Sequence, residues 1–128
     1  MIIKAILIGL SRALMFVLVW GVMIITHELG HYLTLKVLGE EAKAPKIIRK
    51  KGSPFYTFSF NASLDLDNNK YRVVLFGGVL LGFLPFVLLY ADGLFRDVEA
   101  VILIVAYLSG CWPDIKNFIG SVFNNVSR

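Results

Sequence analysis

Two histidines and a glutamate form the most informative pattern of this sequence, His27-Glu28-Leu29-Gly30-His31. On a helix, residues four apart lie one above the other on the same face, so two imidazoles at this spacing can bind one metal ion. Glu28 follows His27 directly and is close enough to act on water at that ion. This HExxH spacing is typical of zinc hydrolases, in which the glutamate is the general base. The sequence therefore predicts one Zn²⁺ ion, with His27 and His31 as ligands and Glu28 as the catalytic residue.

The surroundings of this motif weigh against an accidental match. Between Arg12 and Lys36 the only acidic or imidazole side chains are those of the motif, no lysine or arginine occurs, and the chain has no other histidine. Ionisable groups inside an apolar membrane segment are rare and usually functional, because each of them needs a partner. The alternative interpretation is a set of ordinary polar residues on a helix, without a metal.

The third zinc ligand has to be a carboxylate, because a catalytic site normally has three protein ligands and one open position. The candidates are Glu40, Glu41, Asp65, Asp67, Asp92, Asp97, Glu99 and Asp114. At a rise of 1.5 Å per residue, His27 lies about 22 Å from Arg12, and Asp114 lies about 24 Å from Val98 on the same side of the membrane. This match in depth favours Asp114. The alternative is a carboxylate at the end of a helix, paired with Lys116.

The composition indicates the environment in which these residues act. Of the 128 residues, 57% are apolar and 17% are charged, and the mean hydropathy is +0.72. Soluble domains average roughly 25% charged residues. One cysteine, Cys111, excludes an intrachain disulfide. The formal charge of +4 comes from basic residues that flank apolar runs, so we expect a lipid bilayer and not a nucleic acid as the partner.

The apolar runs predict an α-helical polytopic membrane protein that forms a single domain, 1–128, with three transmembrane helices at 12–36, 73–91 and 98–118. Residues 1–11 are either an interfacial helix or an extension of the first span, and 119–128 form a surface tail. The loop 39–71 contains a strand–turn–strand pattern that predicts a short β-hairpin. Lys and Arg accumulate in this loop and in the tail, which predicts that both lie in the cytoplasm. With its three spans, the chain is expected to be a multi-pass protein of the cell membrane.

Three further details concern the second and third spans. Gly78-x-x-x-Gly82 is interpreted as a close-packing face, as small residues are in membrane helices. Pro113 is expected to break the third helix just before Asp114 and to let that side chain turn toward the first helix. Cys111 is interpreted as a small apolar residue of the span.

These features resemble the three-helix core of the site-2 protease family, which are intramembrane zinc metalloproteases. The resemblance covers nearly the whole chain and includes HELGH in a membrane helix, a polar hairpin loop, a Gly-rich second span and a late intramembrane aspartate. The sequence departs from the family in two places. Asp114 stands in Pro113-Asp114-Ile115 where the family usually has Leu-Asp-Gly, and Gly82 stands where the family often has an asparagine.

The resemblance implies a zinc metalloendopeptidase that cleaves a transmembrane protein or peptide. The strand at 55–60 is a candidate for holding an unwound substrate by strand addition, with Phe58 and Phe60 as candidate substrate-binding residues. Alternatively, the hairpin merely covers the site. A second possible function is a non-proteolytic membrane zinc-binding relative that binds or regulates a membrane protein partner. A third is a small membrane subunit in which the motif is accidental.

Overall fold

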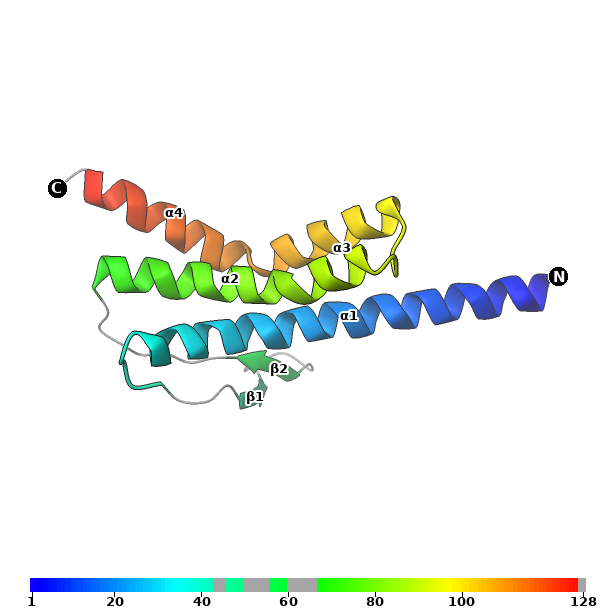
Figure 1. Ribbon diagram of the computed structural model, residues 1–128, viewed down its shortest axis with the longest axis horizontal. Helices are drawn as coiled ribbons and strands as arrows, with labels where there is room; N and C mark the ends of the chain where they lie inside the picture. The colour runs from blue at the N-terminus through cyan, green and yellow to red at the C-terminus, as the bar shows by residue number, and fades with distance from the viewer. Residues whose placement is uncertain (43–45, 50–55, 60–66, 127–128) are drawn as a thin grey trace.

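The structure is a computed structural model that describes residues 1–42, 46–49, 56–59 and 67–126. Its helices are α1 (Ile2–Val37), α2 (Asn68–Ala91), α3 (Asp97–Gly110) and α4 (Trp112–Val126), and its strands are β1 (Lys46–Arg49) and β2 (Tyr56–Ser59). Helix α1 packs along α2, α3 also contacts α1, and α4 contacts α2 (Figure 1). The helical part of the fold is thus a small bundle built around the α1–α2 pair.

Helices α1 and α2 are each long and apolar enough to cross a membrane. Such segments form helices in lipid because every backbone N–H and C=O must then find a partner within the segment. Helices α3 and α4 together pass the same test, but they are bent by 61° where they meet. Two spans, or three if the bent pair is one broken span, are consistent with the predicted membrane protein.

Helix α1 contains 36 residues and is therefore about 54 Å long, well beyond the roughly 30 Å of a bilayer core. It begins at Ile2, so the first eleven residues continue the first span as one helix. The N-terminal end of α1 projects past the other helices (Figure 1). The helix ends at Val37, shortly before Gly39, whose positive φ of 75° suits a residue without a Cβ.

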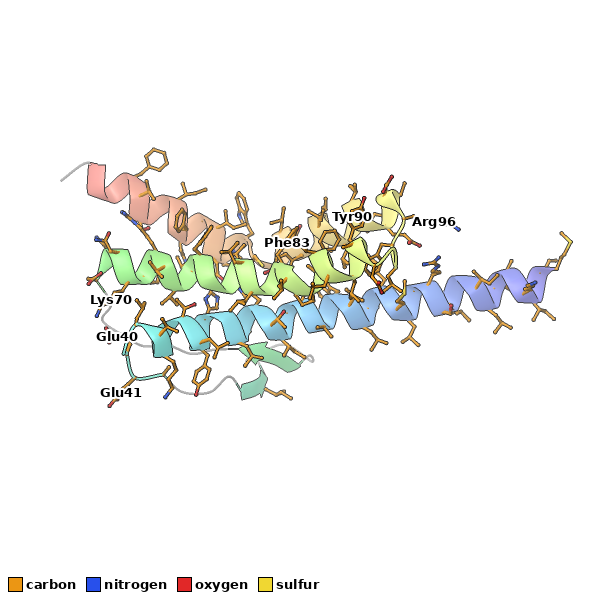
Figure 2. The ribbon with its side chains drawn as sticks, viewed as in Figure 1. Glu40, Glu41, Lys70, Phe83, Tyr90 and Arg96 are labelled. Atoms are coloured by element: carbon orange, nitrogen blue, oxygen red, sulfur yellow. The ribbon has the colours of Figure 1, made fainter. Side chains whose placement is uncertain are left out.

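Helix α2 begins five residues before the predicted span, at Asn68, and includes Pro85. Asp67, which the sequence placed in the polar loop, is its N-cap: the carboxylate accepts a hydrogen bond of 2.8 Å from the backbone N–H of Lys70. The Lys70 ammonium also pairs with Glu40 just beyond the end of α1. Figure 2 shows these two side chains at one end of the bundle, with Tyr90 and Arg96 at the other. Polar groups therefore bracket the apolar middle of the bundle.

The third span, 98–118, is broken, as predicted from Pro113, but the break lies at Cys111 and divides the span into α3 and α4. Pro113 has no N–H to continue the helix, and its ring clashes with the carbonyl four residues earlier. The backbone N–H of Asp114 instead bonds at 3.0 Å to the carbonyl of Cys111, which starts a new helix in another direction. Helix α4 runs on to Val126, so the described part of the predicted surface tail 119–128 is helical.

Strands β1 and β2 pair antiparallel, with Lys46 opposite Ser59 and Arg49 opposite Tyr56. Strand β2 contacts α1, and Figure 1 shows the pair beside α1 on the side away from α2. Residues 50–55, which would form the turn, lie outside the described residues, as does Phe60. The predicted hairpin as a whole therefore stays a prediction.

The buried core lies where α1, α2 and α3 meet. Met23 from α1 and Leu103 from α3 are completely buried, and Tyr107 is 1% exposed. Phe86 from α2 packs in the same cluster. The side chains on the outside of the helices are also largely apolar, as expected of surfaces that face lipid. The core thus holds the three helices together next to the two histidines.

Candidate metal centre

His27 and His31 both face inward from α1 and are buried, with 6% and 7% of their surfaces exposed. Their Nε2 atoms are 3.1 Å apart, because one helical turn places the two imidazoles on the same face. The rings meet edge to face, with their centres 4.6 Å apart. The geometry predicted from the i, i+4 spacing is therefore present in the folded chain.

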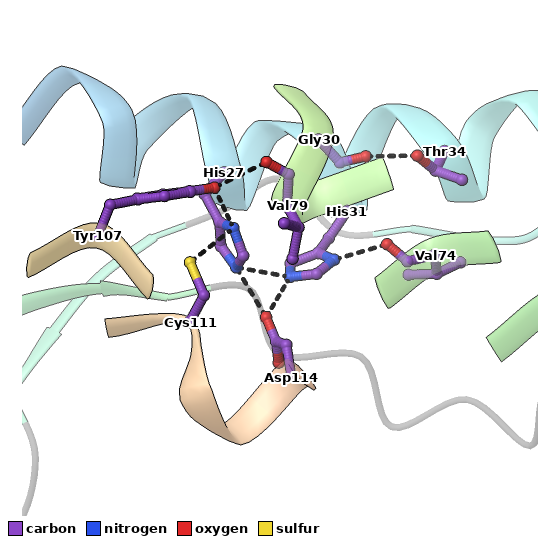
Figure 3. Close-up of polar contacts among 9 residues, drawn as sticks. All are labelled: His27, Gly30, His31, Thr34, Val74, Val79, Tyr107, Cys111 and Asp114. Atoms are coloured by element: carbon purple, nitrogen blue, oxygen red, sulfur yellow. Dashed lines mark hydrogen bonds and ion pairs between the residues drawn. The ribbon is translucent and has the colours of Figure 1, made fainter. Parts of the chain in front are cut away.

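Asp114 reaches the two histidines from the first turn of α4 (Figure 3). Its Oδ2 atom lies 2.7 Å from His27 Nε2 and 3.0 Å from His31 Nε2. Among the described residues, these three side chains form a group whose potential ligand atoms all lie within 4.8 Å of one another. The bend at Cys111 is what turns Asp114 toward α1, so the break in the third span positions the carboxylate.

The hydrogen bonds behind the imidazoles show which ring nitrogens are available. His31 Nδ1 lies 2.9 Å from the carbonyl of Val74, which can only accept, so this nitrogen carries the proton and Nε2 keeps its lone pair. His27 Nδ1 lies 3.0 Å from the hydroxyl of Tyr107. A carboxylate oxygen and the ring nitrogens therefore point electron pairs at one spot. A cation, or a proton shared among them, is needed to offset their repulsion.

This donor set fits Zn²⁺. Zinc accepts imidazole nitrogen and carboxylate oxygen at about 2.0–2.2 Å with tetrahedral geometry, which puts ligand atoms roughly 3.3 Å apart. The observed separations of 2.7, 3.0 and 3.1 Å would need to open by about 0.2–0.6 Å to reach that spacing. Three protein ligands also leave one position free, as in catalytic zinc sites.

The remaining predicted site residues lie outside this convergence. Glu28 is half-buried on α1, next to His27 in the chain, and is not one of the three groups that meet. Phe58 lies in β2, which contacts α1, whereas Phe60 falls outside the described residues. Four of the other candidate carboxylates have partners elsewhere: Asp97 accepts from Tyr90, Glu99 lies near Arg12, and Glu40 and Asp67 both bind Lys70.

Gly78 and Gly82 have a more specific role than the predicted close packing of helices. A Cβ atom on Gly78 would lie 2.2 Å from His31 Cε1, and one on Gly82 would lie 2.7 Å from His27 Cβ. Each glycine therefore leaves the space that one histidine occupies. The i, i+4 spacing of the two glycines matches that of the two histidines, and this was the signal in the sequence that could have indicated their role.

Replacing Gly78 with alanine is expected to weaken metal binding and to destabilise the bundle by about 1–3 kcal/mol, the usual cost of overpacking. The new methyl group would overlap the His31 ring, which its bond to the Val74 carbonyl prevents from moving aside. The matched control is Gly21→Ala, because a Cβ there meets nothing within 4 Å. Zinc affinity, from competition with a chelator, and unfolding measured on both variants check this; equal values would contradict it.

Two residues of α3 and its C-terminal end complete the surroundings and were not predicted. The Tyr107 hydroxyl contacts His27 and also donates to the carbonyl of Val79 at 2.9 Å. Cys111, expected only to fill space, is buried with its Sγ atom 3.5 Å from His27 Nδ1. No short motif marks either residue in the sequence, because both reach the site only through the packing of α3 on α1.

The fold and the site together define a helical protein with two or three potential membrane spans and three potential metal ligands, of which both histidines are buried and Asp114 is partly buried. Comparison of the chain with protein-family models, with curated proteins and with solved structures found no match.

Proposed function

We propose that this chain is an intramembrane zinc metalloprotease similar to the site-2 proteases. The observation that carries the proposal is the convergence of His27, His31 and Asp114, from two separate helices, inside a bundle of apolar helices. A cluster of ionisable groups in a membrane is energetically costly, and such residues are therefore rare there and usually functional. The HExxH spacing adds the expected general base beside the ligands.

The proposed roles follow from the positions of the side chains. His27, His31 and Asp114 would hold one Zn²⁺ ion. When bound, zinc polarises a carbonyl group and makes water nucleophilic at neutral pH. Glu28 would take the proton from the attacking water and pass it to the nitrogen of the leaving amide.

The substrate in this proposal is a membrane-spanning protein or peptide in the lipid bilayer. A helical substrate hides its amides in hydrogen bonds, so a segment must unwind before it can be cleaved. The predicted hairpin would hold that segment by strand addition along β2, with Phe58 and Phe60 alongside. The basic residues of the loop and tail favour a cell-membrane orientation with both in the cytoplasm.

One observation favours the second candidate, a zinc-binding relative that does not cleave but binds or regulates a membrane protein. At Gly82, where the family often has asparagine, a Cβ would lie 2.0 Å from the Tyr107 hydroxyl. The tyrosine therefore occupies the space that a side chain at this position would need, and no amide can help hold a substrate there.

A cleavage assay in proteoliposomes separates the two functions. The purified chain is mixed with single-span test peptides, first with zinc, then after a chelator has removed it, and then after zinc has been restored. Cleavage that stops and resumes with zinc supports the protease. Stoichiometric zinc without cleavage of any test peptide supports the non-proteolytic relative, and a chain that binds no zinc contradicts both.

A further inference from the structure

The Tyr107 side chain connects His27 to the backbone of α2. Its hydroxyl oxygen lies 3.0 Å from His27 Nδ1 and 2.9 Å from the carbonyl oxygen of Val79 (Figure 3). Because a carbonyl can only accept, the hydroxyl proton points to Val79. The oxygen then accepts the proton of His27 Nδ1, which leaves the lone pair of that ring on Nε2, the atom that faces Asp114.

We propose that Tyr107 is a positioning residue that holds the His27 ring with Nε2 directed at the metal. The inference rests on the proposed function, because it needs the metal centre to be real. Imidazole ligands commonly donate their second ring N–H to a partner that fixes both the proton position and the ring orientation. Tyr107 supplies that partner here, and it passes the hydrogen bond on to Val79.

The surroundings of Tyr107 leave its hydroxyl little freedom. The side chain is 1% exposed, and a single Cβ at Gly82 would already lie 2.0 Å from the hydroxyl oxygen. Phe83 packs against its ring, with the ring centres 6.0 Å apart. The His27 ring meets the Tyr107 ring edge to face at 5.9 Å. A hydroxyl held this firmly restricts the rotation of the imidazole that it contacts.

The two histidines are thus oriented in different ways. His31 donates directly to a backbone carbonyl, that of Val74, which no substitution can remove. His27 depends on a side chain. Cys111 Sγ also lies near His27 Nδ1, at 3.5 Å, but sulfur is a weak acceptor and does not replace the hydroxyl. Removing the Tyr107 oxygen should therefore affect His27 and leave His31 unchanged.

The test compares Tyr107→Phe with Tyr90→Phe. The control removes a tyrosine hydroxyl that also makes a hydrogen bond, of 2.8 Å to Asp97, at the end of the bundle away from the cluster. Competition with a chelator is expected to show zinc affinity about 10–100-fold lower in Tyr107→Phe, as for other partners behind metal ligands. Tyr90→Phe is expected to bind zinc like the wild type.

Nuclear magnetic resonance of ¹⁵N-labelled histidine adds a readout that a purely structural role would not move. In the zinc-loaded wild type, the His27 Nδ1–H signal should be shifted downfield by its hydrogen bond; Tyr107→Phe should lose this shift while the His31 signal stays. Absence of the shifted His27 signal from the wild type overturns the proposal without any substitution. Unchanged zinc affinity in Tyr107→Phe overturns it alone, whereas a wild type that binds no zinc overturns the proposed function as well.

Discussion

Replacing Glu28 with glutamine is expected to slow peptide hydrolysis by about 10²–10⁴-fold, the usual contribution of a general base. Glutamine has nearly the same shape as glutamate but cannot take a proton from water. The variant should still bind one zinc ion, because Glu28 is not among the three groups that converge. The measurement is cleavage of a single-span peptide in proteoliposomes, with zinc content determined in the same preparations.

Glu40→Gln is the matched control for this experiment. Glu40 pairs with Lys70 at the end of the bundle, so the same chemical change is made away from the histidines. Its cleavage rate per bound zinc should equal that of the wild type. If Glu28→Gln cleaves at the wild-type rate, Glu28 is not the general base and the proposed mechanism fails.

Replacing Asp114 with alanine is expected to lower zinc affinity by more than the roughly 10–100-fold lost when a partner behind a ligand is removed. The carboxylate oxygen lies within 3.0 Å of both imidazole Nε2 atoms and supplies the negative charge of the donor set. Without it, two neutral imidazoles remain. Zinc content after purification and competition with a chelator measure the loss, and cleavage should fall with it.

Asp97→Ala serves as the control for Asp114. Asp97 is the first residue of α3, at the end of this helix that lies away from Asp114. There it accepts a hydrogen bond from Tyr90. This variant should bind zinc as the wild type does. Full zinc affinity in Asp114→Ala would show that another group is the third ligand. Asp114 would then be the alternative named above, a carboxylate at the end of a helix that pairs with Lys116.

Local features of the chain were readable from the sequence because they depend on neighbours a few residues away. The pairing of His27 with His31 follows from the period of the α-helix, which hydrogen bonds between residues four apart determine. The helical structure of the apolar runs in α1 and α2 follows equally directly, because in lipid each backbone N–H and C=O must find a hydrogen-bond partner within the segment. Element boundaries were less certain: the sequence left open whether residues 1–11 would extend the first span, and the structure shows α1 unbroken from Ile2.

The sequence by itself thus predicted a helical chain with apolar spans, the pairing of the two histidines and the set of carboxylates from which a third ligand could come. Counting residues by depth selected Asp114, and Pro113 predicted a break just before it. Only the tertiary structure gave the 61° bend at Cys111 and the contact of the carboxylate with both histidines. The contribution of Tyr107 and the space left by Gly78 and Gly82 also appear only when α1, α2 and α3 pack together. The physical reason is that His27 and Asp114 are 87 residues apart, so their contact depends on how the helices cross and not on any local hydrogen-bond pattern.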